Sequence, residues 1–329
     1  MRNLIPLTML ALCCTACFEE DDMVMPHDQG DLEVGVAEMG FYYGRQVYYD
    51  LHQNREVASN AVTEWDLRFE SAGGGWTIRL NSSKFMLAGT TGDTVFSDIP
   101  VKEEMDMTFD HSGGYPDSTA IGTWYSLAGD SAISMRQVYL VDRGSDEKSR
   151  PLGIRKVQFD ISGSDYVIRF ADPAGNPGTT RLIRRDPEQQ WIYFSFEAGI
   201  SEIAPHAGQW SLLFTRYTTM LQTNEGEDYP YIVTGVLLNT AGVAACPDTI
   251  HDFGLLALPD TLDLELSTRA DVIGYDWKYY DFDAGIYTIV PGSAYVIRDR
   301  DGFYYKLRFI DFYNDTGEKG YPRFEFVRM

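Results

Sequence analysis

One short segment of the chain concentrates side chains that could bind a metal. Met105, Met107 and His111 lie close together, directly before the glycine pair 113–114. Thioether sulfur and imidazole nitrogen are Lewis bases that ligate iron and other transition metals. If the segment is a strand, alternation of its side chains places all three residues on one face. We therefore take these three residues as candidate metal ligands.

The same residues have a purely structural interpretation. Two alternating methionines also suit core packing, and a histidine beside a glycine turn also suits exposure to solvent. His251 is a weaker ligand candidate, because it follows the turn-like segment 247–249. The remaining histidines fall in stretches that we expect to be tether or loop: His27, His52 and His206.

No enzymatic motif accompanies these residues. The sequence has no GxSxG, HExxH or P-loop pattern, and Gly73–Gly75 lacks the Lys-Ser/Thr partner that a phosphate-binding loop requires. Carboxylates are abundant, but no spacing marks a pair for acid–base chemistry. Asp299 and Asp301 could contribute to a calcium site, although the EF-hand pattern is absent. We predict a protein without catalytic activity.

The elements that must position these residues are predicted to be strands. Short runs of aromatic and β-branched residues, bounded by Gly, Asp or Pro, are typical of strands. Four clear examples are residues 77–80, 166–170, 231–234 and 304–309. No segment shows an apolar 3.6-residue period over three turns. An all-β, antiparallel fold with minor helix follows.

The chain also contains one pattern of residues twice. Residues 47–69 align with residues 192–214 without a gap, since 192 minus 47, 210 minus 65 and 214 minus 69 all give 145. Later landmarks recur in the same order with small insertions: 121–124 and 273–277, 138–141 and 294–297, 156–159 and 306–309. A period of this length is the size of a domain.

We predict two β units related by internal duplication, at residues 41–180 and 181–329. They could be separate domains that meet near the proline-containing stretch 173–190, or they could fuse into one pseudo-symmetric assembly. Packing of the units face to face would allow a cleft between them to serve as a ligand site.

The N-terminus has the features of a lipoprotein signal. Residues 1–17 combine Arg2, an apolar stretch too short to span a bilayer, and small residues before Cys17. Acylation of Cys17 would anchor the protein to a membrane. The alternative is an ordinary secretory signal cleaved near Ala16. Residues 18–40 suit a flexible acidic tether, and the acidic run at 19–22 is also similar to a surface-export signal of Bacteroidetes lipoproteins.

The net charge limits the possible binding partners, and the cysteine content limits the possible disulfides. The net charge of -22 argues against nucleic acid and anionic lipid surfaces as binding partners. With three of the four cysteines in the signal, Cys246 is left alone, so no disulfide can form within the mature chain. We expect Cys246 to be a buried thiol. Stability must then come from a hydrophobic core.

The order of several motifs resembles the HmuY family. The residues that carry this resemblance in the second unit are 193–199, Trp210, Phe214, Thr223–Asn224, 235–238, 295–297, Asp301–Gly302 and 305–309. The first unit shows the same order less faithfully, most clearly at Trp65–Leu67 and Phe69. The resemblance therefore extends over nearly the whole mature chain, once in each unit.

The resemblance implies a Bacteroidetes outer-membrane lipoprotein, exposed on the cell surface, of all-β fold. Characterised members bind haem for iron acquisition and act as hemophores, with two axial His or Met ligands in a cleft between β-ribbons. The span between Trp277 and Tyr295, where family members often carry an axial histidine, has neither His nor Met here. The corresponding span of the first unit offers only Met135.

No axial pair can therefore be carried over by position, and Met105, Met107 and His111 become the haem-ligand candidates. Two functions remain open. The first is haem or porphyrin binding, with delivery to an outer-membrane receptor. The second is binding of a protein or glycan partner through an exposed aromatic face or a ribbon edge, without haem.

Overall fold

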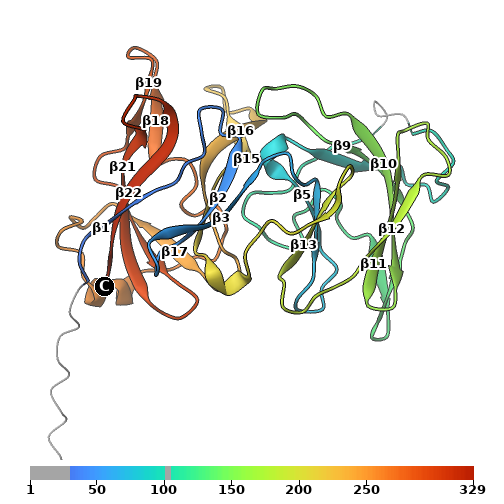
Figure 1. Ribbon diagram of the computed structural model, residues 1–329, viewed down its shortest axis with the longest axis horizontal. Helices are drawn as coiled ribbons and strands as arrows, with labels where there is room; N and C mark the ends of the chain where they lie inside the picture. Colours follow the sequence, from blue (N-terminus) through green and yellow to red (C-terminus); the bar gives the residue numbers. More distant parts are fainter. Residues whose placement is uncertain (1–29, 101–104) are drawn as a thin grey trace, which may run out of the picture.

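The structure is a computed structural model that describes residues 30–100 and 105–329 (Figure 1). Within these residues the chain consists of antiparallel strands joined by turns, with three short 3-10 helices at Ser82–Lys84, Ala207–Gln209 and Leu258–Asp263. The predicted all-β class is confirmed. None of the helices in this part of the chain is long and apolar enough to cross a membrane. The signal at 1–17, Cys17 and His27 lie outside the described residues.

Two five-stranded sheets form the two ends of the elongated molecule (Figure 1). The sheet at the left of the figure runs in the order β1 Glu33–Val36, β22 Lys319–Arg328, β21 Tyr304–Tyr313, β20 Ala294–Arg298 and β17 Ala244–Asp248. The sheet at the right runs in the order β12 Thr179–Ile183, β11 Asp165–Ala171, β10 Ile154–Ser162, β9 Val138–Asp142 and β6 Leu87–Thr90.

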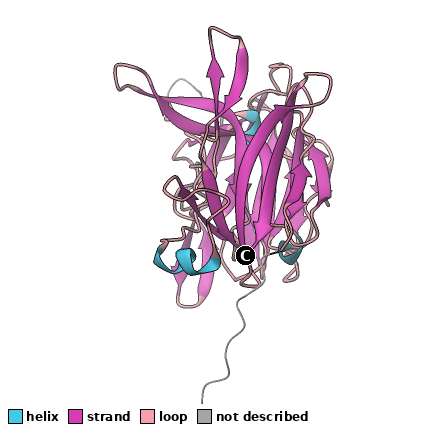
Figure 2. Cartoon of the chain, turned by 90° about the vertical axis from the view of Figure 1, so that its left-hand side faces the viewer, coloured by secondary structure: helices cyan, strands magenta, loops and turns pink. Residues whose placement is uncertain are grey.

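Two four-stranded sheets lie between these ends. One has the order β16 Asp228–Leu238, β15 Leu212–Gln222, β2 Arg45–Asp50 and β3 Arg55–Ala61. The other has the order β14 Gly199–Ser201, β13 Trp191–Ser195, β4 Leu67–Glu70 and β5 Ile78–Leu80. Two separate hairpins complete the fold: β7 Tyr125–Ala128 with β8 Ser131–Ser134, and β18 Lys278–Asp281 with β19 Ile286–Ile289. Figure 2 shows hairpins that project beyond the upper end of the left-hand sheet.

The middle sheets join parts of the chain that are far apart in sequence. Strand β2 pairs with β15, and β4 pairs with β13. Aromatic side chains cross the same two seams. Tyr48 of β2 packs edge-on against Trp210 at 5.1 Å between ring centroids, and Trp65 packs edge-on against Tyr193 at 5.0 Å. Each seam therefore contains an aromatic pair that packs a strand against a distant partner.

Because β2 pairs with β15 and β4 pairs with β13, strands of the two sequence repeats combine into two hydrophobic cores. The first core combines residues 37–51 with residues 212–326, and the second core contains residues 67–196. The expected division between units at 180 and 181 therefore falls inside the second core and not between the cores. The physical reason is that β13 closes the second core against β4, whereas β2 closes the first core against β15.

The expected tether at 18–40 is wrong over its last part. Residues 33–36 form β1, which pairs with residues 323–326 of β22. Ala37 and Met39 are fully buried in the first core. Pairing of β1 satisfies the backbone groups at the edge of β22, which otherwise would be exposed. Of the predicted tether, residues 18–29 lie outside the described residues.

Candidate functional site

An open cavity beside the first core lies between the β15–β16 ribbon and the β18–β19 hairpin. Its volume is about 550 Å³, within the range of small-molecule sites in proteins. Eight of the residues that line it are aromatic: Phe41, Tyr42, Tyr43, Tyr231, Tyr275, Tyr279, Tyr280 and Tyr287. We call this cavity the tyrosine cleft.

Several of these rings face solvent rather than the core. Tyr231 is 54% exposed and Tyr279 is 49% exposed. Tyr280 packs edge-on against Phe282 and against Tyr287, each at 5.1 Å between ring centroids. An exposed cluster of rings at a cavity wall offers a stacking surface to a flat ligand, because aromatic rings gain energy from stacked and edge-on contacts.

Two buried cations lie at the bottom of the tyrosine cleft. Lys278 donates a hydrogen bond to the carbonyl oxygen of Thr234, and its ammonium lies 4.1 Å from the centroid of the Trp277 ring. Burial lowers the pKa of Lys278 to about 7, and nearby Asp276 opposes this shift. Burial also lowers the pKa of the Arg216 guanidinium. The cleft therefore combines an aromatic wall with a basic floor.

The residues of the tyrosine cleft do not supply a usual axial pair for haem iron. Its lining contains no histidine, methionine or cysteine. Tyrosine can also ligate haem iron, as the phenolate. Burial raises the pKa of Tyr275 and Tyr287, which disfavours the phenolate at these positions. The lining fits the flat, apolar porphyrin ring better than it fits the iron.

The predicted ligand segment does not form a strand. Residues 105–111 make only an isolated bridge between Thr108 and Ala88. Met105 and Met107 are half-buried, and His111 is exposed. The Nδ1 atom of His111 accepts a hydrogen bond from the backbone N–H of Gly113 at 3.0 Å. The expected single strand face is therefore wrong. None of the three predicted ligands lines the tyrosine cleft.

The weaker candidate, His251, has a structural partner. Its Nδ1 lies 2.9 Å from a carboxylate oxygen of Asp248. Burial would raise the pKa of Asp248, but hydrogen bonds from the backbone of Ile250 and from His251 lower it. Asp299 likewise accepts hydrogen bonds from the backbone N–H groups of Asp301 and Phe303, as part of a turn. Within residues 30–100 and 105–329, no group of three His, Cys, Asp or Glu side chains could hold a metal ion.

Cys246 is a buried free thiol, as the sequence predicts. Burial raises its pKa, which leaves little of the reactive thiolate at neutral pH. His206 lines a second cavity of about 410 Å³ beside β13 and β14, together with residues of β3. This cavity lies at the junction of the two middle sheets, where a site between units was expected. Its rings are fewer than those of the tyrosine cleft.

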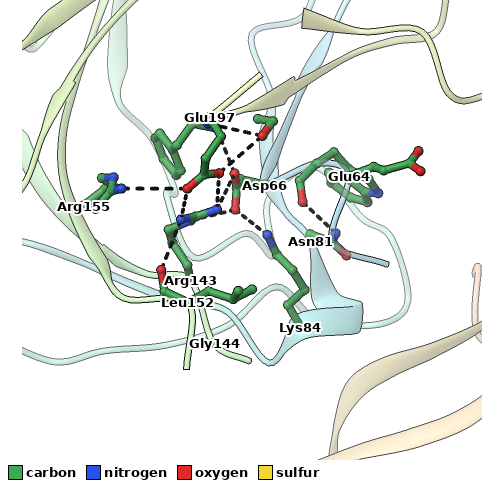
Figure 3. A network of polar contacts seen from close by, with 12 residues as sticks. Glu64, Asp66, Asn81, Lys84, Arg143, Gly144, Leu152, Arg155 and Glu197 are labelled. Carbon is green, nitrogen blue, oxygen red and sulfur yellow. Dashed lines mark hydrogen bonds and ion pairs between the residues drawn. The ribbon is translucent and has the colours of Figure 1, made fainter. Parts of the chain in front are cut away.

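A second cluster of charged residues extends from the second core to the surface, with Asp66, Lys84 and Arg143 buried and Glu197 exposed (Figure 3). Asp66 forms an ion pair with Lys84, and both side chains are completely buried. Arg143 donates to Asp66 through Nε at 3.0 Å and also pairs with Glu197. The backbone N–H of Phe196 donates to Asp66 at 2.9 Å. These contacts satisfy one another, so the cluster holds β4 and β13 together rather than offering a binding site.

Sequence patterns did not identify the tyrosine cleft, although they contained a signal. Tyr279, Tyr280 and Phe282 lie in a short segment bounded by acidic and glycine residues. Clustered aromatic residues in a two-stranded hairpin have too little sheet around them to be buried. That pattern favours an exposed aromatic hairpin at this position.

Comparisons with known proteins agree with the predicted resemblance. Residues 259–326 match the family model described as HmuY protein. This segment includes the β18–β19 hairpin and most of the residues that the cleft draws from the second unit. No curated protein matches the chain.

Two solved structures are similar to this chain over most of its length, at low sequence identity. The crystal structure of apo PinO from Porphyromonas gingivitis is 9% identical, with 91% of this chain and 98% of that chain covered at a TM-score of 0.29. The apo HmuY analog (TFO) of Tannerella forsythia is 12% identical, with 92% and 98% covered at a TM-score of 0.26. Both scores are too low to carry an argument about shared architecture. The match of residues 259–326 confirms the resemblance of this chain to the HmuY family.

Proposed function

We propose that this protein is a surface lipoprotein that binds a porphyrin, haem included, in the tyrosine cleft and performs no catalysis. The observation that carries the proposal is the cavity of about 550 Å³ with eight aromatic lining residues. A porphyrin is a large flat apolar ring, and a cleft lined by aromatic side chains buries such a surface favourably. A role in iron acquisition, with delivery to an outer-membrane receptor, follows from the family resemblance.

Recognition in this proposal depends on the ring and not on axial ligation. The cleft lining has no histidine or methionine, so haem and metal-free porphyrin offer it the same stacking surface. Lipidation of Cys17 belongs to the proposal as well. It would hold the protein at the outer membrane by its acyl chains, with the cleft facing outward.

The experiment is a titration of the chain that starts after Cys17 with haemin and with metal-free protoporphyrin IX. We expect both to saturate with similar affinity, and haemin to give no sharp bands of six-coordinate iron after reduction. Tyr231→Ala and Tyr280→Ala should each weaken both ligands about 10-fold, or about 1.4 kcal/mol. Tyr115→Ala, an exposed tyrosine outside the cleft, is the matched control.

Saturable binding of haemin alone, with sharp reduced bands, would contradict recognition by the ring and would point to an axial pair elsewhere. Absence of binding by either compound would favour the second candidate, a protein or glycan partner. The observation that supports this candidate is the exposure of Tyr229, Tyr231, Tyr279 and Phe282 on projecting ribbons. Sugars and protein surfaces both pack on exposed aromatic rings.

A further inference from the structure

The floor of the tyrosine cleft contains two basic side chains that interact with acidic residues only at longer range, Lys278 with Asp276 and Arg216 with Glu147 and Asp146. Arg216 and Lys278 are each only 7% exposed. Among the residues that the structure describes, neither forms an ion pair. By contrast, the buried Lys84 and Arg143 both pair with Asp66. A buried cation normally has an opposite charge beside it, because removal of its hydration is costly.

Both cations also have unused hydrogen-bond donors. The Nε atom of Arg216 is buried without a hydrogen-bond partner, and its Nη2 donates to the carbonyl oxygen of Ser145 at 3.3 Å. The ammonium of Lys278 has three donors and makes one hydrogen bond, to Thr234. A buried donor without a partner destabilises the folded chain, because it has lost its hydrogen bonds to water. A ligand that accepts these hydrogen bonds would remove that cost.

Thr234 is a neighbour of both basic residues. It is the cross-strand partner of Arg216 in the β15–β16 ribbon, and its carbonyl oxygen accepts the hydrogen bond from Lys278. The remaining charged residues of the cleft are Lys319, Glu147 and Asp276. Below about pH 7, where Lys278 is protonated, three basic and two acidic residues leave the cleft with a positive balance, in a chain whose net charge is -22. An anion is therefore attracted to this cleft although the protein as a whole repels anions.

We infer that Arg216 and Lys278 form a carboxylate-binding subsite, so that the ligand of the tyrosine cleft is a flat aromatic carboxylate. This inference rests on the proposed function, because it assigns a second contact to the same ligand. A carboxylate has two oxygen atoms that accept several hydrogen bonds, which suits a guanidinium and an ammonium that line the same cleft. The aromatic wall then stacks on the ring, and the basic floor fixes its orientation.

The test compares protoporphyrin IX with its dimethyl ester, in which both carboxylates are blocked and the ring is unchanged. We expect the free acid to bind at least 10-fold more tightly than the ester in a fluorescence titration. Arg216→Gln and Lys278→Met should each weaken the acid toward the affinity of the ester, and leave the ester unaffected. Lys306→Met is the matched control, because Lys306 is a buried lysine that donates to the carbonyl oxygen of Leu256 outside the cleft.

Equal affinities of acid and ester for the unmodified chain would overturn the carboxylate subsite and leave porphyrin binding in place. Failure of both compounds to bind would overturn the proposed function as well. The comparison of acid and ester needs no substitution, so it tests the carboxylate subsite even if a variant does not fold. Weakening of the ester by Lys278→Met would show a packing role for this residue and would also count against the subsite.

Discussion

The side chains of Asn81 and Asn239 make two equivalent hydrogen bonds, one pair in each copy of the internal repeat. Asn81 donates through Nδ2 to the carbonyl oxygens of Val62 and Trp65, at 2.8 and 2.9 Å. Asn239 donates to those of Ala207 and Trp210, at 2.6 and 2.9 Å. Both acceptors shift by the offset of the sequence repeat, since 207 minus 62 and 210 minus 65 give 145.

This correspondence supports internal duplication as the interpretation of the sequence repeat. It also predicts equal effects of two substitutions. Asn81→Ala and Asn239→Ala should each lower the free energy of unfolding by about 2–3 kcal/mol, because each leaves without a donor two carbonyl groups, which are buried for Asn81 and partly buried for Asn239. Urea denaturation of both variants measures this. Asn224→Ala, in an exposed turn, should change the stability little; a large difference between Asn81→Ala and Asn239→Ala would contradict equivalence.

The ion cluster around the buried Asp66 predicts a larger loss of stability. Asp66→Asn removes the negative charge between Lys84 and Arg143 and leaves a completely buried ammonium without its partner. Breaking a buried pair in this way costs about 3–5 kcal/mol. Asp315→Asn is the control, because the Asp315 side chain is 94% exposed and its pair with Arg323 lies at the surface. Chemical denaturation should separate the two variants, and similar losses would argue against a stabilising role for the cluster.

Strands β13 and β14 belong to the second sequence repeat but complete the second core, and this predicts which fragments of the chain fold. Residues 65–202 contain the complete second core, including β13 and β14, whereas residues 30–180 lack both of these strands. We expect the first fragment to unfold cooperatively and the second to show no cooperative transition, because its β4 has lost the partner that closes the core. Thermal unfolding followed by circular dichroism measures this. Cooperative unfolding of 30–180 alone would mean that β2 can replace β13.

The strands were predictable from the sequence, but their partners were not. Segments 166–170, 231–234 and 304–309 lie in β11, β16 and β21, because local alternation and turn residues determine a strand. The seam between β2 and β15 could not be predicted. In a repeated sequence, β2 and β13 have similar patterns, so either could pair with β4. Only long-range packing, such as the contact of Trp65 with Tyr193, selects between them.

The tyrosine cleft was difficult to predict for the same reason. Its walls come from residues 41–43, the β15–β16 ribbon and the β18–β19 hairpin, which no local pattern connects. The prediction of metal ligands at 105–111 depended on a strand, but that segment forms only one bridge to the neighbouring sheet. Spacing alone therefore identified residues of suitable chemistry without showing whether they share a face.

The low pKa of Lys278 predicts how stability depends on pH. Burial lowers this pKa from near 10.5 to about 7, so between pH 7 and 10 the unfolded chain binds a proton that the folded chain does not. The free energy of unfolding should therefore rise with pH across this window, by up to about 1.4 kcal/mol per unit. Above about pH 10 the buried tyrosines oppose this, because burial raises the pKa of residues such as Tyr217 and Tyr295.

Urea denaturation between pH 7 and 9 should show this rise in the unmodified chain and a flatter dependence in Lys278→Met. Other titrating groups at the cleft floor, such as Asp276, are retained in this variant, so the difference between the two slopes isolates the amine. Lys148→Met, at an exposed position, should keep the original slope. Identical slopes for the unmodified chain and Lys278→Met would mean that the amine keeps an ordinary pKa in the folded protein.

The last prediction separates the tyrosine cleft from the ligands that the sequence pattern favoured. Replacement of Met105, Met107 and His111 together by alanine should leave the haemin titration unchanged, because none of these residues lines the cleft. Met107 packs close to Gly89, so the triple variant should lose some stability without losing affinity. Difference absorption spectra of haemin, measured at a temperature where the variant remains folded, test this. Loss of a saturable spectrum on a folded variant would return the site to residues 105–111, whereas Tyr280→Ala would then have no effect on affinity.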